Sequence, residues 1–342
     1  MSRPASPKPS VPAGSPAPVP AAGADRRRRP PGRPPSGPPV RAGGGALSRP
    51  PHSAGVRRIA LDAGGPTLSA LLAEADGPPR ATILALHGGG MTAAYFDGQA
   101  HPGLSLLTLG AALGYTVLAV DRPGYGSSAA ALPDGATLAE QAATLRRALD
   151  DHAGRSPLGA GVFVVAHSYG GKLALTAAAR GLHDDLVGID ISGCGHRYAA
   201  PPPNGGPPAF GGHGGPRLNW GPLTLYPPQT FALAGSVVAP MPLREAAEAA
   251  RWERTFPTVA AGVRVPVRLT FAEHEGWWRH DPEALEELSG LLSADRLLID
   301  RQPAAGHNIS LGWAARAYHL RALGFLEECL QARVSGPAAR TP

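Results

Sequence analysis

The sequence predicts an α/β fold in which a mostly parallel sheet of eight strands carries helices on both faces. Two observations support this prediction. Apolar, strand-like segments alternate with helical patterns over roughly 250 residues, which is typical of parallel sheets covered on both sides. The chain of 342 residues is 43% hydrophobic, so it can build a large core. One Pro- and Gly-rich interval interrupts the alternation. A TIM barrel would show the same alternation, so the pattern alone does not settle function.

The strands and helices follow from local patterns in chain order. The turn "DAGGP" joins the first two strands, and the third strand ends in three glycines. Thr137 is the candidate N-cap of the second helix, and Glu140 stands three residues later, as in a capping box. We predict strands at 56–61, 67–75, 80–90, 115–128, 161–168, 186–193, 265–275 and 295–307. We predict helices at 104–114, 137–152, 172–181, 243–256, 282–293 and 314–332.

Residues 1–55 form a low-complexity segment rich in Pro, Ala and Arg. This segment has too little apolar surface to offset the entropy of ordering, so we predict a disordered tail before an α/β domain at 56–342. Eleven of the 32 basic residues lie in 1–58 beside a single acid, Asp25, which leaves the rest with 21 bases and 25 acids. The basic pI therefore belongs to the tail, and we predict no nucleic-acid partner.

Residues 194–262 break the alternation of strands and helices. The interval begins with the Pro- and Gly-rich run "APPPNGGPPAFGGHGGP" and later contains the helical pattern "LREAAEAARWERTF". We predict an insertion that forms a lid over the carboxyl ends of the strands. Its aromatic side chains either line an apolar acyl pocket or only pack the lid. These residues are Trp220, Tyr226, Phe231 and Trp252.

The remaining bulk features concern disulfides, membrane spans and cofactors. Two cysteines, Cys194 and Cys329, with no CxxC spacing predict neither a disulfide framework nor a zinc site, and they are typical of a cytoplasmic protein. No run of about 18 apolar residues occurs, so no membrane span is predicted. The patterns GxxxxGK[ST] and GxGxxG are absent, and we predict no cofactor and no metal. The sequence does not determine the oligomeric state.

The stretch "GVFVVAHSYGG", at 161–171, runs from an apolar strand into a helical pattern within about three residues of Ser168. Such a turn holds a serine in a strained backbone conformation and needs small residues on either side of it. Ala166 and Gly170 occupy those positions. We interpret Ser168 as a candidate nucleophile, with an ordinary strand-to-helix connection as the alternative. The backbone N–H of Tyr169, the next residue, is then a candidate oxyanion donor.

Glycines at 88–90 follow the third strand in "LALHGGG". They either make a simple tight turn or let the backbone pass close to the serine, where the N–H of Gly89 is a second candidate oxyanion donor. His87 is interpreted as a structural residue of this loop. We expect His167, although adjacent to Ser168, to point away from it.

His307 is the candidate general base. It lies in "AAGHNIS", between the last strand and the last helix, and catalytic residues of open α/β sheets gather in such loops. Three other histidines near predicted loop ends are weaker candidates, namely His196, His274 and His280.

The candidate acid comes from "VRLTFAEHEGWW", at the end of the next-to-last strand. Glu275 is preferred because it falls in the loop after the strand, and Glu273 is the alternative. Asp190 and Asp300 are weaker candidates. A carboxylate here orients the imidazole and stabilises its protonated form. Trp277 and Trp278, which follow the acid, either wall the site or fill space.

Five motifs together resemble the α/β-hydrolase fold family over about residues 56–332: "HGGG" (87–90), "DRPGYGSS" (121–128), "AHSYGG" (166–171), "AEHE" (272–275) and "GHN" (306–308). The resemblance implies Ser168 as nucleophile, His307 as base and Glu275 as acid, with oxyanion amides from Gly89 and Tyr169. Asp121 and Arg122 would be structural. Ala166 replaces the family's usual glycine, and Glu275 stands where aspartate is commoner.

The resemblance implies a serine hydrolase that cleaves a carboxylic ester, or next a thioester, through an acyl-enzyme on Ser168. A small-molecule substrate with an apolar acyl group is expected. A natural-product tailoring enzyme on the same fold, with elimination, acyl-transfer, C–C-cleaving or haloperoxidase-like chemistry, is the alternative. A non-catalytic scaffold is the third possibility.

Overall fold

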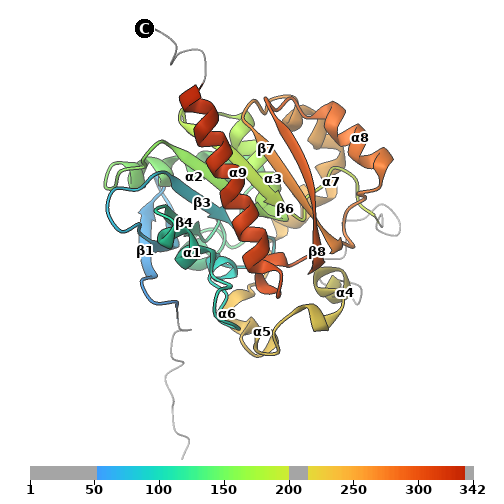
Figure 1. The fold of residues 1–342 in the computed structure, drawn as a ribbon, viewed down its shortest axis with the longest axis horizontal. Coiled ribbons are helices and arrows are strands. Elements are labelled where there is room, and N and C mark those ends of the chain that lie inside the picture. Colours follow the sequence, from blue (N-terminus) through green and yellow to red (C-terminus); the bar gives the residue numbers. More distant parts are fainter. Residues whose placement is uncertain (1–51, 200–214, 336–342) are drawn as a thin grey trace, which may run out of the picture. The chain divides into compact units, whose positions relative to one another are not determined.

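The computed structural model describes residues 52–199 and 215–335 (Figure 1). The predicted tail, up to residue 51, and the Pro- and Gly-rich start of the predicted insertion, at 200–214, lie outside the described residues. The strands are β1 Arg57–Asp62, β2 Thr67–Ala73, β3 Thr82–Leu86, β4 Thr116–Val120, β5 Val162–His167, β6 Leu186–Ser192, β7 Val267–His274 and β8 Leu297–Gly306. The short 3-10 helices are η1 Ala93–Phe96, η2 Gly126–Ser128, η4 Leu223–Leu225 and η5 Ile309–Leu311. The α-helices are α1 Leu106–Ala112, α2 Leu138–Ala153, α3 Tyr169–Ala179, α4 Gly215–Trp220, α5 Gln229–Ala232, α6 Ala234–Val237, α7 Leu243–Ala260, α8 Pro282–Leu291 and α9 Ala315–Ser335.

The eight strands form a single sheet in the order β1-β2-β4-β3-β5-β6-β7-β8. β2 pairs antiparallel with both β1 and β4, and every other neighbouring pair is parallel. The prediction of a mostly parallel, eight-stranded α/β sheet is therefore confirmed. β1 and β8 are edge strands that do not pair with each other, which distinguishes this open sheet from a TIM barrel.

Helices cover both faces of the sheet, as alternate residues of the central strand β3 show. Leu84 and Leu86 pack in a core cluster with α2, α3 and α7, whereas Ile83 and Ala85 pack in a second cluster with α1 and α9. Successive side chains of a strand point to opposite faces, so one apolar strand supplies both cores. This two-sided burial explains why β3 is apolar from Ile83 to Leu86.

Local sequence patterns predicted most ends of the longer helices and of the strands to within about three residues. The predicted capping box is present at the start of α2, where Thr137 and Glu140 exchange hydrogen bonds between side chain and backbone. Two strands were predicted too long. The strand predicted at 80–90 is β3, which ends at Leu86, before the glycines. The strand predicted at 115–128 is β4, which ends at Val120 and is followed by a loop that contains η2. Pro123 has no N–H to pair, and Gly124 and Gly126 have φ angles of 91° and 52°, which an extended strand does not accept.

The chain between β6 and β7 contains α4 to α7, and Figure 1 shows α4, α5 and α6 grouped beyond the end of β8. Two backbone hydrogen bonds join this region to the loop after β3. The N–H of Thr92 donates to the carbonyl of Val237 at 2.8 Å, and the N–H of Ala239 donates to the carbonyl of Gly90 at 2.9 Å. The segment between β6 and β7 therefore contacts the glycine loop directly.

None of the helices within 52–199 and 215–335 combines the length and the hydrophobicity that a bilayer-crossing segment needs.

Candidate active site

Ser168 is the single residue between the end of β5 and the start of α3. Its φ of 52° and ψ of −114° are strained for a residue with a side chain, and Ala304 is the only other non-glycine residue with positive φ in the described part of the chain. A conformation of this kind costs on the order of 1–3 kcal/mol and persists only where the surroundings enforce it. The strained turn expected from the sequence is therefore present, and it lifts the serine out of the strand.

Packing explains why the residues on either side of the turn are small. A Cβ added to Gly170 would lie 2.2 Å from the carbonyl oxygen of Leu86, so only glycine lets α3 approach β3 here. Ala166, in contrast, is fully buried in the core, where its methyl group is accommodated. The departure at Ala166 thus causes no clash, whereas the glycine at 170 is required by the backbone approach.

His307 and Glu275 meet because their strands are parallel neighbours. β7 and β8 are in register at His274 and Gly306, so the residues that follow each strand emerge side by side. Nδ1 of His307 lies 2.8 Å from Oε2 and 3.0 Å from Oε1 of Glu275. Both side chains are buried. A proton on Nδ1, directed at the carboxylate, leaves Nε2 as the ring nitrogen that can accept a proton.

The alternative acids have other partners. Glu273 is exposed, and its Oε2 accepts a hydrogen bond from the N–H of Ala304 at 2.7 Å. Asp190 is buried against Arg268 and Tyr318. Of the acids considered from the sequence, Glu275 alone is hydrogen-bonded to His307 in the described structure. The N–H of Trp277 also donates to Oε1 of Glu275 at 2.9 Å, which helps to hold the carboxylate in place.

Ser168 and His307 line one cavity of about 480 Å³. The glycine loop forms another part of its wall. A Cβ on Gly88 would lie 3.1 Å from Cβ of Ser168, and one on Gly89 would lie 3.7 Å from Cβ of Tyr169. Tyr169 opens α3, so its N–H has no acceptor within the helix. The structure therefore brings the two candidate oxyanion residues and the serine to the same cavity.

A buried network fixes the orientation of the peptide between Gly88 and Gly89. Nη2 of Arg122 donates to the Gly88 carbonyl at 3.1 Å, and Nδ1 of His87 lies 2.9 Å from the same oxygen. The carbonyl and the N–H of one trans peptide point in opposite directions. The Gly88 carbonyl points toward Arg122, so the Gly89 N–H points away from Arg122. His87 is structural, as expected, and burial beside Arg122 holds its pKa well below the ordinary value.

Glu245 of α7 is the centre of this network. Its carboxylate forms a fully buried ion pair with Arg122 and accepts hydrogen bonds from Tyr125 Oη at 2.7 Å and Gln141 Nε2 at 3.1 Å. The hydroxyl of Tyr125 in turn accepts the N–H of Gly90 at 2.9 Å. Arg122 is a structural residue, as the resemblance implied. Sequence reasoning missed Glu245, because it resembles any other acid in the first turn of an amphipathic helix.

His167 lies beside His307, with 4.8 Å between the ring centroids, a proximity that the sequence did not reveal. Its ring nitrogens lie 3.1 Å from Oγ of Ser192 and 3.2 Å from Oδ1 of Asn308, and the ring stacks on Tyr95. Burial, together with the nearby His307, holds the pKa of His167 well below its ordinary value. His167 is therefore a neutral wall of the cavity near neutral pH.

The aromatic residues considered from the sequence divide between the two roles. Trp220, Trp277 and Trp278 line the cavity. Tyr226 and Phe231 pack edge-on against Trp220, so they support the wall without lining it.

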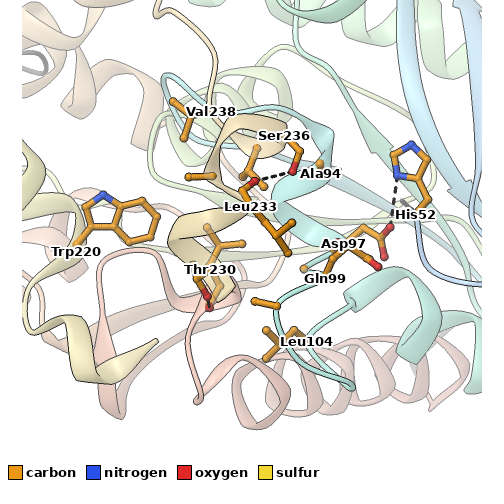
Figure 2. Close-up of a pocket in the computed structure, with 15 residues that line it drawn as sticks. His52, Ala94, Asp97, Gln99, Leu104, Trp220, Thr230, Leu233, Ser236 and Val238 are labelled. Carbon is orange, nitrogen blue, oxygen red and sulfur yellow. Dashed lines mark hydrogen bonds and ion pairs between the residues drawn. The ribbon is translucent and has the colours of Figure 1, made fainter. Parts of the chain in front are cut away.

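A second, smaller cavity of about 20 Å³ lies between the η1 region and α5–α6. Figure 2 shows the residues that line it. Trp220 and Val238 line both cavities. At its far side, Nδ1 of His52 lies 3.7 Å from Asp97. The larger cavity, which contains the serine and the His307–Glu275 pair, is the candidate active site.

The fold and the site define an α/β protein that presents a serine on a strained strand-to-helix turn next to a histidine–carboxylate pair. A sequence model of the alpha/beta hydrolase family matches residues 83–330, and the chain belongs to that family. A search of curated proteins found no match.

Solved structures with the same fold include lipases and esterases. The chain is similar to a soluble variant of monoglyceride lipase from Saccharomyces cerevisiae (14% identity, TM-score 0.60, covering 80% of this chain and 95% of that one). It is also similar to a carboxyl esterase from Bacillus coagulans (15%, 0.57, 80% and 99%) and to an esterase from Thermogutta terrifontis (16%, 0.56, 80% and 99%). At these identities the likeness shows the fold alone.

Proposed function

We propose that the protein is a serine hydrolase that cleaves carboxylic esters through an acyl-enzyme on Ser168. The observation that carries the proposal is the pairing of buried Glu275 with Nδ1 of His307, on the wall of the cavity that also contains Ser168. A carboxylate behind an imidazole, beside a strained serine, is the arrangement that activates a hydroxyl nucleophile.

The first half of the reaction forms the acyl-enzyme. Oγ of Ser168 attacks the ester carbonyl while Nε2 of His307 takes its proton, and Glu275 stabilises the resulting imidazolium. The backbone N–H groups of Gly89 and Tyr169 donate hydrogen bonds to the oxyanion of the tetrahedral intermediate. The intermediate collapses when the C–O bond to the leaving alcohol breaks, and His307 returns the proton to that alcohol.

The second half releases the acid. A water molecule gives a proton to His307 and attacks the acyl carbonyl, and the second tetrahedral intermediate expels Ser168, which regains the proton. We further propose that the insertion between β6 and β7 caps this site, because Trp220, Met241 and Ala246 from it line the cavity.

A fluorophosphonate probe tests the nucleophile directly. We expect the wild-type protein to be labelled and Ser168→Ala to be unlabelled, with Ser127→Ala as a matched serine variant that keeps labelling. Equal labelling of wild type and Ser168→Ala would refute the assignment. A panel of acyl esters and thioesters of varied chain length then defines the substrate. Labelling of Ser168 without turnover of any member of the panel would instead favour non-hydrolytic chemistry on the same fold.

A further inference from the structure

The candidate active site contains a buried lysine that the proposed reaction does not use. Lys172 lies four residues after Ser168 in α3, so the two residues share one side of the first helical turn. Lys172 is only 2% exposed and lines the same cavity as Ser168 and His307.

Aromatic rings surround the Lys172 ammonium. Nζ lies 4.1 Å from the centroid of the Trp278 ring, 5.3 Å from Trp252 and 5.7 Å from Tyr198. Trp278 and Tyr198 also line the cavity, whereas Trp252 is fully buried beneath it. Ring faces attract a cation and partly replace its lost hydration, which allows the ammonium to stay charged here.

The carboxylates within 52–199 and 215–335 leave this ammonium unpaired. Among the described residues, no hydrogen bond or ion pair involves Nζ of Lys172. Glu275, the acid whose charge acts on it, is hydrogen-bonded to His307. Burial lowers the pKa of Lys172 to about 8, and Cys194 and Glu275 partly oppose that effect. Most of the lysine is therefore protonated at pH 7, with its charge facing the cavity and unmatched.

The composition of the chain also marks this position. Lys8 and Lys172 are the only lysines among 32 basic residues, and every other one is arginine. Within the described residues, 52–199 and 215–335, Lys172 is therefore the single position that carries a compact ammonium. An ammonium is a compact point charge, whereas a guanidinium is planar and spreads its charge over a fork of donors.

We propose that Lys172 is a specificity-determining residue that binds a carboxylate on the substrate, so that the preferred substrates are esters with a free carboxylate near the scissile carbonyl. This inference rests on the proposed function and names its substrate class. A single ammonium matches the single charge of a carboxylate and supplies the ion pair that the buried site lacks. The spacing of Lys172 from Ser168, about 6 Å along the helix face, favours half-esters of short dicarboxylic acids.

Matched esters test the specificity. The p-nitrophenyl half-ester of glutaric acid carries the carboxylate, and p-nitrophenyl pentanoate is its neutral counterpart. We expect the wild-type protein to prefer the anionic ester in kcat/KM, and Lys172→Met to reduce that anionic-to-neutral ratio by about 10- to 100-fold, the effect of losing one charge-assisted hydrogen bond. Met241→Leu, which changes the same cavity without changing charge, should leave the ratio within about twofold.

The wild-type protein provides a test that needs no variant at Lys172. Both esters depend on the same His307 and Ser168, so the ratio of their kcat/KM values cancels the titration of those groups. We expect the ratio to fall between pH 7 and 9.5, as the ammonium loses its proton. The titratable groups that face it are Cys194, Tyr198 and Glu275. A ratio that is constant with pH and unchanged in Lys172→Met would overturn the proposal.

Binding without turnover separates this inference from the proposed function. Calorimetry with ethyl hydrogen glutarate on Ser168→Ala, beside the same variant with Lys172→Met added, measures the carboxylate contact alone. We expect about 10- to 100-fold weaker binding in the double variant. If no ester is hydrolysed but this loss is seen, the subsite stands and the proposed hydrolysis fails. Equal affinities of the two proteins would refute the subsite.

Discussion

Replacing Glu245 with glutamine removes one charge from the fully buried ion pair with Arg122 while keeping the size of the side chain. Arg122 cannot lose its proton in a protein, so the variant leaves an uncompensated cation in the core. Breaking a buried pair in this way costs about 3–5 kcal/mol. That cost is a large share of the about 5–15 kcal/mol that typically stabilises a folded domain. We therefore expect Glu245→Gln to lower the free energy of unfolding by about 3–5 kcal/mol.

Glu74→Gln is the matched control. Glu74 forms an ion pair with Arg57 at 2.9 Å, but the two side chains are 52% and 56% exposed. Solvent screens such a pair, so its loss costs under about 1 kcal/mol. Urea unfolding of the wild-type protein and both variants measures the two costs from their midpoints and slopes. Equal shifts for Glu245→Gln and Glu74→Gln would show that burial of the Arg122 pair does not matter.

The same variant also tests how the glycine loop is held. Glu245 holds Arg122 and Tyr125, which in turn bond the Gly88 carbonyl and the Gly90 N–H. Loss of its charge loosens the peptide that presents the Gly89 N–H, and loss of one oxyanion donor costs about 10²–10³ in rate. We expect slower fluorophosphonate labelling of folded Glu245→Gln, below its unfolding midpoint. An unchanged labelling rate would contradict this positioning role.

Three further predictions follow from packing, pairing and protonation. Gly170→Ala places a methyl group 2.2 Å from a backbone oxygen and should unfold at lower urea than wild type, whereas Gly290→Ala in α8 meets nothing within 4 Å and should gain up to about 1 kcal/mol. Glu275→Gln should lower kcat by about 10⁴, as expected for a triad acid, and Glu273→Gln should change it less than about twofold; similar losses in both would count against Glu275. Burial lowers the pKa of His319 to about 3. As pH falls below about 6.5, His319 therefore takes up a proton in the unfolded chain but stays neutral in the folded protein. The free energy of unfolding should then decrease by about 1.4 kcal/mol per pH unit until pH reaches about 3. Urea midpoints at pH 7 and pH 5 should therefore differ less in His319→Gln than in wild type, and an identical pH dependence would contradict this.

Local pattern was enough to predict most of the fold. A strand such as β3 is apolar from Ile83 to Leu86 because both of its faces are covered, and that signal lies in consecutive residues. The capping box of α2 is equally local, since Thr137 and Glu140 are three residues apart. The strands predicted at 80–90 and 115–128 extend past the ends of β3 and β4, because a strand ends where its pairing with a neighbouring strand ends, and the local sequence does not contain that information.

The sequence predicted the site residues that follow from their place at the end of a strand. It left the choice between two neighbouring glutamates open, because that choice depends on the register between β7 and β8. Glu273 and Glu275 lie two residues apart, and side-chain alternation no longer applies once the chain leaves the sheet. The pairing of His274 with Gly306 places Glu275, and not Glu273, next to His307. Register between two strands is a property of the assembled sheet, so no local pattern could have resolved this choice.

The sequence by itself determined the order of the eight strands and of the longer helices, and the serine on a tight turn, because each depends on residues that are close in the chain. The short helices α4, α5 and α6 were not predicted. Only the tertiary structure decided the contacts that cross long stretches of the chain. Glu245 reaches Arg122 over 123 residues, and the rings around Lys172 come from α7 and from the segments that follow β6 and β7. An unpaired charge costs free energy only when packing removes the water around it. The unpaired lysine beside Ser168 could therefore be recognised only from the folded structure.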